Sequence, residues 1–573
     1  MSTFNGYYEQ ELLNLRQLSK EFARRNPALA PLLGTDTASD PDVERLLEGV
    51  AFLTGLVRQR LDDEFPELIQ EIAQLLYPQF LHPLPCMSML EFKPRGPLGD
   101  RLGIAAGCEV QSVPVDGEPT RFCTSFAVDI EPLRLETVRW DGGATQERSL
   151  LLEFAFDAIR ASDWQGDRLR LYLGDGLAEA SKLLRLLARN LREVRIGATG
   201  QPLLLLGREA LSMAGFDPAL ELMPYPATAH PAYRLLQEYF ALPEKFLFVD
   251  LQGFSRWRAR GESGRFSVRL MFDDLPDWTP AVSPQSLRLN VSPVVNLFRQ
   301  DAHPLRIDQR QAEYRIQPAD QSRCPALRIY SVDRVEGYLP GGKPRQYRPY
   351  TALEQGDGYH LRIRASLLDS QGFEHYLSLP VQDGRRSGES TLSIGLTCTH
   401  GNLPESLRLG DINQPSDHSP DRVSFSNIRS ITPSQPPLFD DRLLWRVLSQ
   451  LNANHLKLAS REHLCELLSL YLPAQGAESD GAKRRRIESV VQVEAVDERR
   501  FVRGLPITGR AVRVMCRGDH FHGPGDLFLF GCVLDEFFAG CVAVNSFSAL
   551  SLQDTVSGET LVWPAKTGRL CLL

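Results

Sequence analysis

Two amphipathic segments open the chain. From Asn5 to Arg25, apolar side chains recur every three or four positions, which places them along one face of an α-helix. A second helix is predicted to begin at Pro41 with Asp40 as its N-cap, and Pro66 is expected to interrupt it before its apolar face continues to Tyr77. The two apolar stripes consist of Tyr8, Leu12, Leu15, Leu18 and Phe22 in the first helix and of Val43, Leu46, Val50, Leu53, Val57 and Leu61 in the second.

A proline-rich run follows these helices, with the sequence QLLYPQFLHPLPCMSMLEF from Gln74 to Phe92. Pro78, Pro83 and Pro85 block continuation of the helix and hold the residues before them extended. The run is therefore predicted to be a rigid joint at which helix gives way to strand. Its residue types indicate structure and not chemistry.

Beyond Pro85 the pattern changes to short alternating segments separated by Gly, Pro and Asp, which is typical of antiparallel sheet. Two helices, Leu177 to Leu191 and Pro231 to Phe240, are predicted within a β-rich domain spanning 86–280. A second β-rich domain is expected over 281–432. Strands and helices do not alternate regularly, so a doubly wound nucleotide-binding sheet is not expected.

The pattern becomes helical again after residue 432. A pair of helices is predicted over 433–474, marked by apolar positions at Leu443–Leu451 and Leu464–Tyr471. Residues 475–487 contain no apolar side chain larger than alanine before Ile487 and are interpreted as a linker. Residues 488–573 are predicted to form a small α+β domain. With residues 1–85 as an N-terminal helical region, the fold class is α+β, multidomain and mainly antiparallel in its β domains.

Composition limits the function classes. The 573 residues carry a formal charge of −8, so the chain has no general attraction for nucleic acid or anionic membranes, and protein partners are expected. No secretory signal opens the chain, and no apolar run approaches the roughly 18 residues that span a bilayer. The ten cysteines are scattered without a CxxC pair. These features predict a cytoplasmic protein with reduced, core-type thiols and no direct membrane insertion.

Two segments carry candidate chemistry. His520 and His522, near Asp519 and Asp526, could hold a transition metal for a metal-dependent hydrolase, although the spacing fixes no third ligand and also suits a polar turn. The basic run Lys483–Arg486 could bind nucleic acid, although it has no interleaved aromatic residue and also suits a solvated linker. We favour the turn and the linker. No catalytic, cofactor-binding or metal-binding residue is therefore predicted, and the chain is not expected to be an enzyme.

Five segments in order along the chain resemble the TssF family, a baseplate subunit of the bacterial type VI secretion system. The proline-rich run LLYPQFLHPLP with the strand MSMLEF is the first of them. The others are PTRFCTSFAVDIEPL (Pro119–Leu133), NVSPVVNLFRQDAHPL (Asn290–Leu305), TCTHGNLPESL (Thr397–Leu407) and GDLFLFGCVLDEFF (Gly525–Phe538).

The resemblance implies a structural wedge subunit that assembles with TssG, TssK and TssE around the VgrG spike hub, with more than one copy expected per wedge. It also implies a cytoplasmic protein docked at the inner membrane through the secretion assembly, without cofactors. The candidate partner interface comes from the residues themselves. Tyr8, Leu12, Leu15 and Phe22 form a narrow seam close to coiled-coil spacing, which could pack on another subunit or on the second helix of the same chain.

Overall fold

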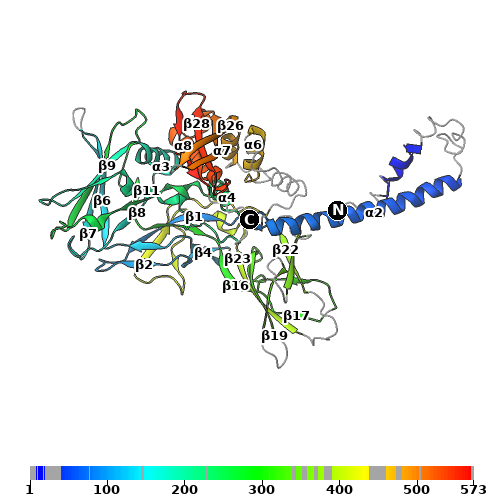
Figure 1. Cartoon of the computed structure of the whole chain (residues 1–573). Helices are drawn as coiled ribbons and strands as arrows, with labels where there is room; N and C mark the ends of the chain where they lie inside the picture. The colour runs from blue at the N-terminus through cyan, green and yellow to red at the C-terminus, as the bar shows by residue number, and fades with distance from the viewer. Residues whose placement is uncertain are drawn as a thin grey trace. The chain divides into compact units, whose positions relative to one another are not determined.

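A computed structural model describes residues 8–9, 11–16, 18–19, 41–76, 78–142, 147–226, 229–308, 310–338, 344–350, 358–366, 372–379, 390–437, 460–472, 480–502 and 505–568. The chain forms two compact units. The first comprises Met1–Tyr77 with Asp440–Leu448, and the second comprises Pro78–Phe439 with Ser449–Leu573. Figure 1 labels their helices and strands.

One long helix dominates the first unit. Helix α2 runs from Pro41 to Leu76, and upstream of it residues 8–9, 11–16 and 18–19 are also helical. The predicted interruption at Pro66 is wrong, because Pro66 lies inside α2. An interior proline costs about 3 kcal/mol through one lost hydrogen bond and a steric clash. Since helix propagation adds one hydrogen bond per residue, the helix-forming sequence on both sides can outweigh this local loss.

The proline-rich joint begins the second unit. A 3₁₀ turn, η1 (Pro78–Phe80), is entirely buried, and Leu81 and Cys86 are buried after it. Leu84 forms an isolated antiparallel bridge with Gln435. Strand β1 then starts at Met87, so the predicted change from helix to strand is confirmed.

The first sheet has six antiparallel strands in the order β24-β3-β4-β15-β1-β25. Its strands are β1 (Met87–Pro94), β3 (Glu109–Val115), β4 (Glu118–Thr124), β15 (Val291–Val295), β24 (Gln414–Pro415) and β25 (Val423–Asn427). Strands β2 (Leu102–Ile104) and β5 (Val128–Ile130) pair beside it. The boundary predicted between residues 280 and 281 cuts across this sheet, because β15, β24 and β25 come from beyond it. Pairing between strands so distant in sequence leaves no local pattern to detect.

Two further sheets fill most of the region between β5 and β15. A five-stranded sheet has the order β10-β9-β13-β7-β6, and a four-stranded sheet has the order β11-β12-β8-β14. The stacked rings of Phe154 and Phe266, 4.9 Å apart, belong to the core of the first of these. The elements are β6 (Leu133–Asp141), β7 (Ser149–Phe156), β8 (Arg168–Leu173), α3 (Gly176–Arg189), β9 (Leu191–Gly197), β10 (Leu204–Gly207), η2 (Arg208–Ala210), β11 (Leu211–Met213), η3 (Ala214–Phe216), α4 (Pro231–Ala241), η4 (Pro243–Leu247), β12 (Phe248–Gln252), η5 (Phe254–Arg256), β13 (Arg265–Phe272) and β14 (Leu287–Arg288).

The next sheet has the order β16-β23-β19-β20-β21-β22-β18, with β17 paired to β23. All its pairs are antiparallel except β20 with β21. Its elements are β16 (Phe298–Asp301), β17 (Leu305–Ile307), β18 (Tyr314–Ile316), β19 (Arg328–Tyr338), β20 (Arg345–Pro349), β21 (Gly358–Ala365), β22 (Phe373–Ser378) and β23 (Ser390–Thr399), followed by η7 (Leu403–Ser406). The predicted multidomain α+β class with mainly antiparallel sheets is confirmed.

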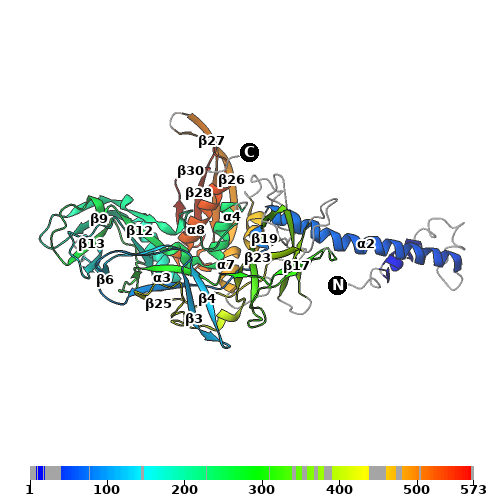
Figure 2. The ribbon, with the colours of Figure 1, turned by 90° about the horizontal axis from the view of Figure 1, so that it is seen from below.

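The C-terminal part combines helices with a mixed sheet. Its elements are α6 (Arg461–Ser469), α7 (Asp480–Glu488), β26 (Val490–Val502), β27 (Leu505–Cys516), η9 (Gly518–His520), α8 (Pro524–Gly540), β28 (Phe547–Asp554), β29 (Thr560–Val562) and β30 (Lys566–Thr567). Strands β27 and β28 are parallel and joined through α8, while the hairpin of β26 and β27 extends beyond the rest of this sheet (Figure 2). The linker predicted at 475–487 is wrong from Asp480 onward, because that segment is helix α7. The predicted helix at Leu443–Leu451 lies outside the described residues.

Two glycines explain why α8 packs so closely. A Cβ at Gly525 would lie 2.2 Å from the backbone nitrogen of Lys182 in α3, and one at Gly531 would lie 2.3 Å from the Trp563 ring. Both distances are far below van der Waals contact, so no larger residue fits without movement of α3 or Trp563. Gly525 therefore permits the contact between α3 and α8, and Gly531 permits the contact between α8 and Trp563.

We predict that Val533→Asp unfolds the C-terminal domain, whereas Val544→Asp does not. Val533 is 0% exposed inside α8, and Val544 is 48% exposed in the same domain. An unpaired carboxylate in an apolar core costs several kcal/mol, which is comparable to the total stability of a domain. Limited proteolysis and thermal unfolding measure the difference. A wild-type cleavage pattern for Val533→Asp would contradict the packing described here.

Candidate functional site

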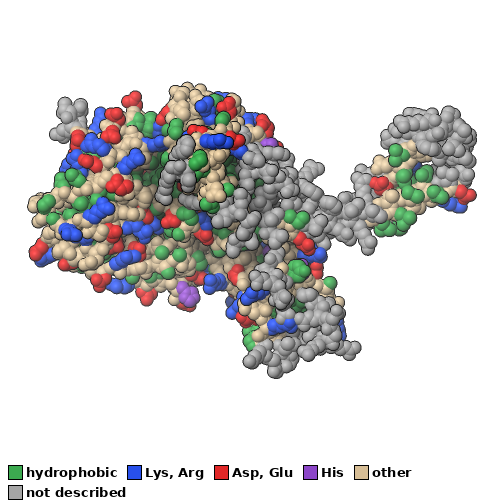
Figure 3. Space-filling model, viewed as in Figure 1, with side chains coloured by type: hydrophobic (Ala, Val, Ile, Leu, Met, Phe, Trp, Pro, Cys, Tyr) green, Lys and Arg blue, Asp and Glu red, His purple; other side chains and the backbone are tan. Residues whose placement is uncertain are grey.

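Helix α2 exposes a row of large apolar side chains. Leu46, Val50 and Leu53 recur at spacings of four and three and are 68%, 38% and 64% exposed. Phe52 and Leu56, one helical turn apart, are also exposed. We call Leu46, Val50, Leu53 and Leu56 the α2 apolar surface. Apolar side chains also gather on the described part of this unit in Figure 3. Contiguous exposed apolar surface of this kind marks an interaction site more often than a solvated face.

The buried side of α2 carries small residues. Ala51 and Ala73 are 0% and 1% exposed, and Gly55 is also buried. Among the described side chains of α2, the apolar residues that are buried are small and the most exposed apolar residues are large, which differs from an amphipathic helix whose large apolar stripe packs into its own core. The sequence pattern located Leu46, Val50 and Leu53 but did not indicate that they remain uncovered. Phe52 and Leu56 fall outside the predicted stripe and were missed.

The predicted seam of the first helix is only partly described. Tyr8, Leu12 and Leu15 are half-buried and lie in helical residues, while Phe22 lies outside the described residues. Leu13 and Leu18 are exposed in the same segment. The role of the seam as a partner interface stays a prediction.

The candidate metal-binding residues form hydrogen bonds with different partners. The Nδ1 atom of His520 lies 2.9 Å from the backbone oxygen of Arg485, and the backbone nitrogen of His522 donates to the Asp526 carboxylate at 3.1 Å. The same carboxylate oxygen of Asp526 accepts from the guanidinium group of Arg486 at 3.0 Å. No group of three or more metal-ligating side chains gathers within the described ranges. The arrangement fits the polar turn that we favour over a metal centre.

The basic run does not form one solvated surface. Arg484 and Arg485 are exposed on α7, but Arg486 is buried and pairs with the fully buried Asp526 at the start of α8. The Arg486 guanidinium also lies 5.7 Å from the centre of the Tyr239 ring. The interpretation of all four residues as a solvated linker is therefore wrong for Arg486, which connects α7, α8 and α4. Sequence showed its charge but not the distant carboxylate that compensates it.

We predict that Arg486→Ala destabilises the protein by about 3–5 kcal/mol, because it leaves Asp526 as an unpaired buried charge. The matched change Arg484→Ala, on the exposed side of the same helix, should stay within about 0.5 kcal/mol of wild type. Denaturant unfolding measures both values. Equal effects of the two variants would show that the pair with Asp526 contributes nothing.

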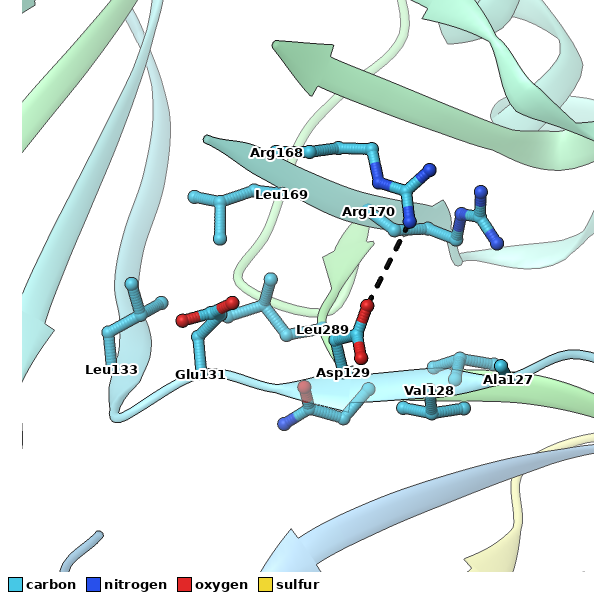
Figure 4. Close-up of a pocket in the computed structure, with 11 residues that line it drawn as sticks. Ala127, Val128, Asp129, Glu131, Leu133, Arg168, Leu169, Arg170 and Leu289 are labelled. Carbon is cyan, nitrogen blue, oxygen red and sulfur yellow. Dashed lines mark ion pairs between the residues drawn. The ribbon is translucent and has the colours of Figure 1, made fainter. Parts of the chain in front are cut away.

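A small cavity lies between β5 and β8 in the second unit (Figure 4). Its volume is about 30 Å³, and charged side chains of both signs line it. The carboxylate of Asp129 lies 3.8 Å from Arg168, and that of Asp250 lies 2.8 Å from Arg170. Carboxylates already paired with arginine are poorly placed for acid/base work, and this volume suits a water molecule more than a substrate. The cavity therefore fits a structural ion network.

Two histidines, the half-buried His82 and the buried His375, lie where the joint contacts the sheet of β16–β23. The ring of His82 lies 4.8 Å from that of Tyr330, whose hydroxyl donates to the backbone oxygen of Pro224 at 3.0 Å. Burial lowers the pKa of His82 to about 4. Burial, with a smaller contribution from nearby His82, lowers the pKa of His375 on β22 to about 3. Both imidazoles are therefore neutral in the folded protein at neutral pH.

These pKa values predict loss of stability in mild acid. Because the folded protein binds protons on these histidines less readily than the unfolded chain does, the stabilisation is complete above pH 6.5 and is lost as the pH falls toward 4. The loss at pH 5 should be on the order of 2 kcal/mol for His82. Thermal unfolding at pH 7 and pH 5 measures it. His82→Phe should reduce the pH dependence, while the exposed control His303→Phe should not.

The comparison with protein families decides the assignment. The family model described as "Type VI secretion system, TssF" matches residues 1–570. The chain belongs to the TssF family. The type VI secretion system component TssF1 of Pseudomonas aeruginosa is 30% identical, with 98% of each chain covered. The resemblance seen in the five sequence segments is thus confirmed.

Solved structures agree with the family assignment. A chain of the type VI secretion system TssK-TssF-TssG baseplate subcomplex matches with a TM-score of 0.78 and 29% identity, covering 92% of this chain and 99% of that one. A chain of the baseplate complex from the type VI secretion system shares the fold, with a TM-score of 0.61 and 23% identity over 99% and 100% of the two chains. No helix within the described ranges is long and apolar enough to cross a membrane.

Proposed function

We propose that this TssF-family chain is a structural wedge subunit of the type VI secretion baseplate. It holds the geometry of the assembly before firing and permits rearrangement during sheath contraction, without turnover of a substrate. The proposal is supported by the match over nearly all of a chain from the TssK-TssF-TssG baseplate subcomplex. It places the protein in the cytoplasm, docked at the inner membrane through the secretion assembly.

The proposed partners are TssG and TssK, which the description of that subcomplex names, together with TssE and the VgrG spike, which the family resemblance implies. More than one copy per wedge is expected. The α2 apolar surface supports a helical partner, because its residues recur with the period that presents them to a helix lying alongside. The exposed apolar row on α2 is the observation on which we base the proposed position of the contact.

The structure extends the interface candidates. Tyr8, Leu12, Leu15 and Phe22 were proposed from sequence, and the exposed Leu46 and Leu53 on α2 now join them. Aromatic residues such as Tyr8 and Phe22 are among the side chains enriched at protein interfaces, and aliphatic side chains add to the binding energy when a partner removes them from water. Covering a leucine contributes about 1.5–3 kcal/mol through burial alone. We therefore propose that TssG packs its helices on this N-terminal unit.

We predict that Leu46→Glu combined with Leu53→Glu abolishes co-purification with TssG and stops secretion, while the chain remains folded. Both side chains are exposed, so charged replacements should not disturb the chain's own core. The matched control is Leu203→Glu with Leu205→Glu, two leucines about 60% exposed at and just before the edge strand β10. Circular dichroism measures folding, and pull-down measures binding.

Leu12→Glu combined with Leu15→Glu tests the seam in the same assay. A folded variant that does not bind TssG would place the seam in the interface. Loss of folding would instead assign the seam to contacts within the chain. If the α2 variant and the seam variant both bind TssG like wild type, the proposed contact is wrong.

A further inference from the structure

A large polar groove lies in the second unit where two sheets diverge. Its walls are β3 and β4 of the first sheet, labelled in Figure 2, and β16 and β23 of the sheet that follows it, labelled in Figure 1. The chain passes from one sheet to the other at the base of the groove. Strand β15 pairs with β4 through Val294 and Val295, and β16 pairs with β23 from Phe298 onward. The groove has a volume of about 1510 Å³.

A buried asparagine fixes this divergence. Asn296 is fully buried, and its side-chain amide donates to the backbone oxygen of Arg121 on β4 at 2.6 Å. Its side-chain oxygen accepts from Thr399 and from the backbone nitrogen of His400, both at 2.8 Å. The centre of the Phe298 ring lies 4.0 Å from the Arg121 guanidinium and 4.5 Å from the centre of the His400 ring. The two walls therefore have fixed positions at their base.

The wall formed by the first sheet is acidic. Glu109, Glu118 and Asp417 line it, and none of the three has an ion-pair or hydrogen-bond partner for its carboxylate within the described ranges. Arg121, also on this wall, is engaged with Phe298. The opposite wall is mixed, with Arg299 and Asp301 both exposed on β16. Three of the unpaired carboxylates thus lie on the wall of the first sheet, whereas the rest of the lining carries Arg323 as well as Arg299 and Asp301.

The carboxylates are spread along the wall. Glu109 pairs with Cys123 across the hairpin, while Glu118 lies five residues before Cys123 on β4. At roughly 3.3 Å per residue, the positions of the two residues are about 16 Å apart along the strand. One compact cation cannot contact both of them. An extended chain with two basic side chains can do so.

We propose that this groove binds an extended segment of a partner protein that carries arginine or lysine side chains. Small-molecule sites are usually 300–1,000 Å³ and mostly apolar, whereas this groove is larger, open and lined by charged groups. The bound segment lies along β4, and its basic side chains pair with Glu109 and Asp417 at one end and with Glu118 at the other. The groove goes beyond the proposed function and shares no residue with the α2 apolar surface.

The test uses the full chain, co-purified with TssG, and a fluorescein-labelled peptide of about ten residues in a glycine-serine background. The probe carries two arginine pairs about five residues apart, and a second probe carries glutamate in their place. Binding is measured by fluorescence anisotropy at about 0.15 M salt, where charges more than about 8 Å away are largely screened. Saturable binding of the arginine probe and none of the glutamate probe is expected.

The variant Glu109→Gln, Glu118→Gln, Asp417→Asn removes the three carboxylates with little change of shape. It should raise the dissociation constant of the arginine probe at least about tenfold. The control Asp100→Asn, Asp274→Asn, Asp277→Asn removes the same charge at exposed positions outside the groove and should change it less than about twofold. Equal effects of the two variants, equal binding of the glutamate probe, or no saturable binding by wild type would each overturn the proposal.

The two proposed contacts can be tested separately, because each variant should remove one kind of binding and leave the other. Leu46→Glu with Leu53→Glu, assayed as the full chain alone, should retain binding of the arginine probe even when it loses TssG. The groove variant should retain TssG while it loses the probe. Loss of probe binding in the α2 variant, with its fold intact by circular dichroism, would contradict a separate groove.

Discussion

Burial of the proline-rich joint constrains the second unit more than any other single feature. The segment Pro78–Cys86 has little regular structure, yet it is largely buried, so its backbone polar groups need partners from elsewhere in the chain. Leu84 and Gln435 exchange two backbone hydrogen bonds of 2.8 and 2.9 Å, and the Cys86 oxygen accepts from the backbone nitrogen of Asn296 at 2.8 Å. Pro78, Pro83 and Pro85 have no N–H, which reduces the number of buried donors to satisfy. Segments more than two hundred residues away must therefore be in place before the joint can be buried.

Buried ion pairs likewise restrict how neighbouring elements of the second unit can pack. Lys245 and Glu238 are 1% and 0% exposed with 2.5 Å between their charged atoms, and the same glutamate accepts from the backbone nitrogen of Leu222. Burial lowers the pKa of Lys245, while the glutamate opposes that shift. Arg486 with Asp526 connects α7 to α8 in the same way. Such pairs contribute little net stability over apolar residues but make a mismatched arrangement costly, because either partner alone would be a buried unpaired charge. They favour one relative placement of elements that apolar packing alone would leave less defined.

The sequence predicted features whose causes are local and missed those whose causes are distant. The start of α2 at Pro41 and the change from helix to strand after Pro78 follow from proline geometry and periodicity, and both are correct. The predicted break at Pro66 was wrong because the prediction considered the local cost of a proline but not the stability of the long helix on both sides of it. The boundary between residues 280 and 281 cuts through a sheet, because β15 pairs with β4 about 170 residues earlier and with β1 just over 200 residues earlier. Arg486 was interpreted as solvated because Asp526, 40 positions away, compensates its charge only in three dimensions. For the site, periodicity located Leu46 and Leu53 but could not show whether the chain itself covers them.

The α2 apolar surface and the acidic groove differ in the kind of binding that each can support. Apolar burial is not directional, so the α2 surface can supply affinity but little discrimination between helices of similar size. The groove has the opposite properties, since exposed ion pairs contribute about 0–1 kcal/mol each but penalise a partner of the wrong charge or spacing. A subunit that must hold its neighbours and also change their arrangement needs both strong contacts that persist and weak ones that can be exchanged. The two contacts proposed here, an apolar one on the N-terminal helix and a polar one between two sheets, would let the chain release the second without giving up the first.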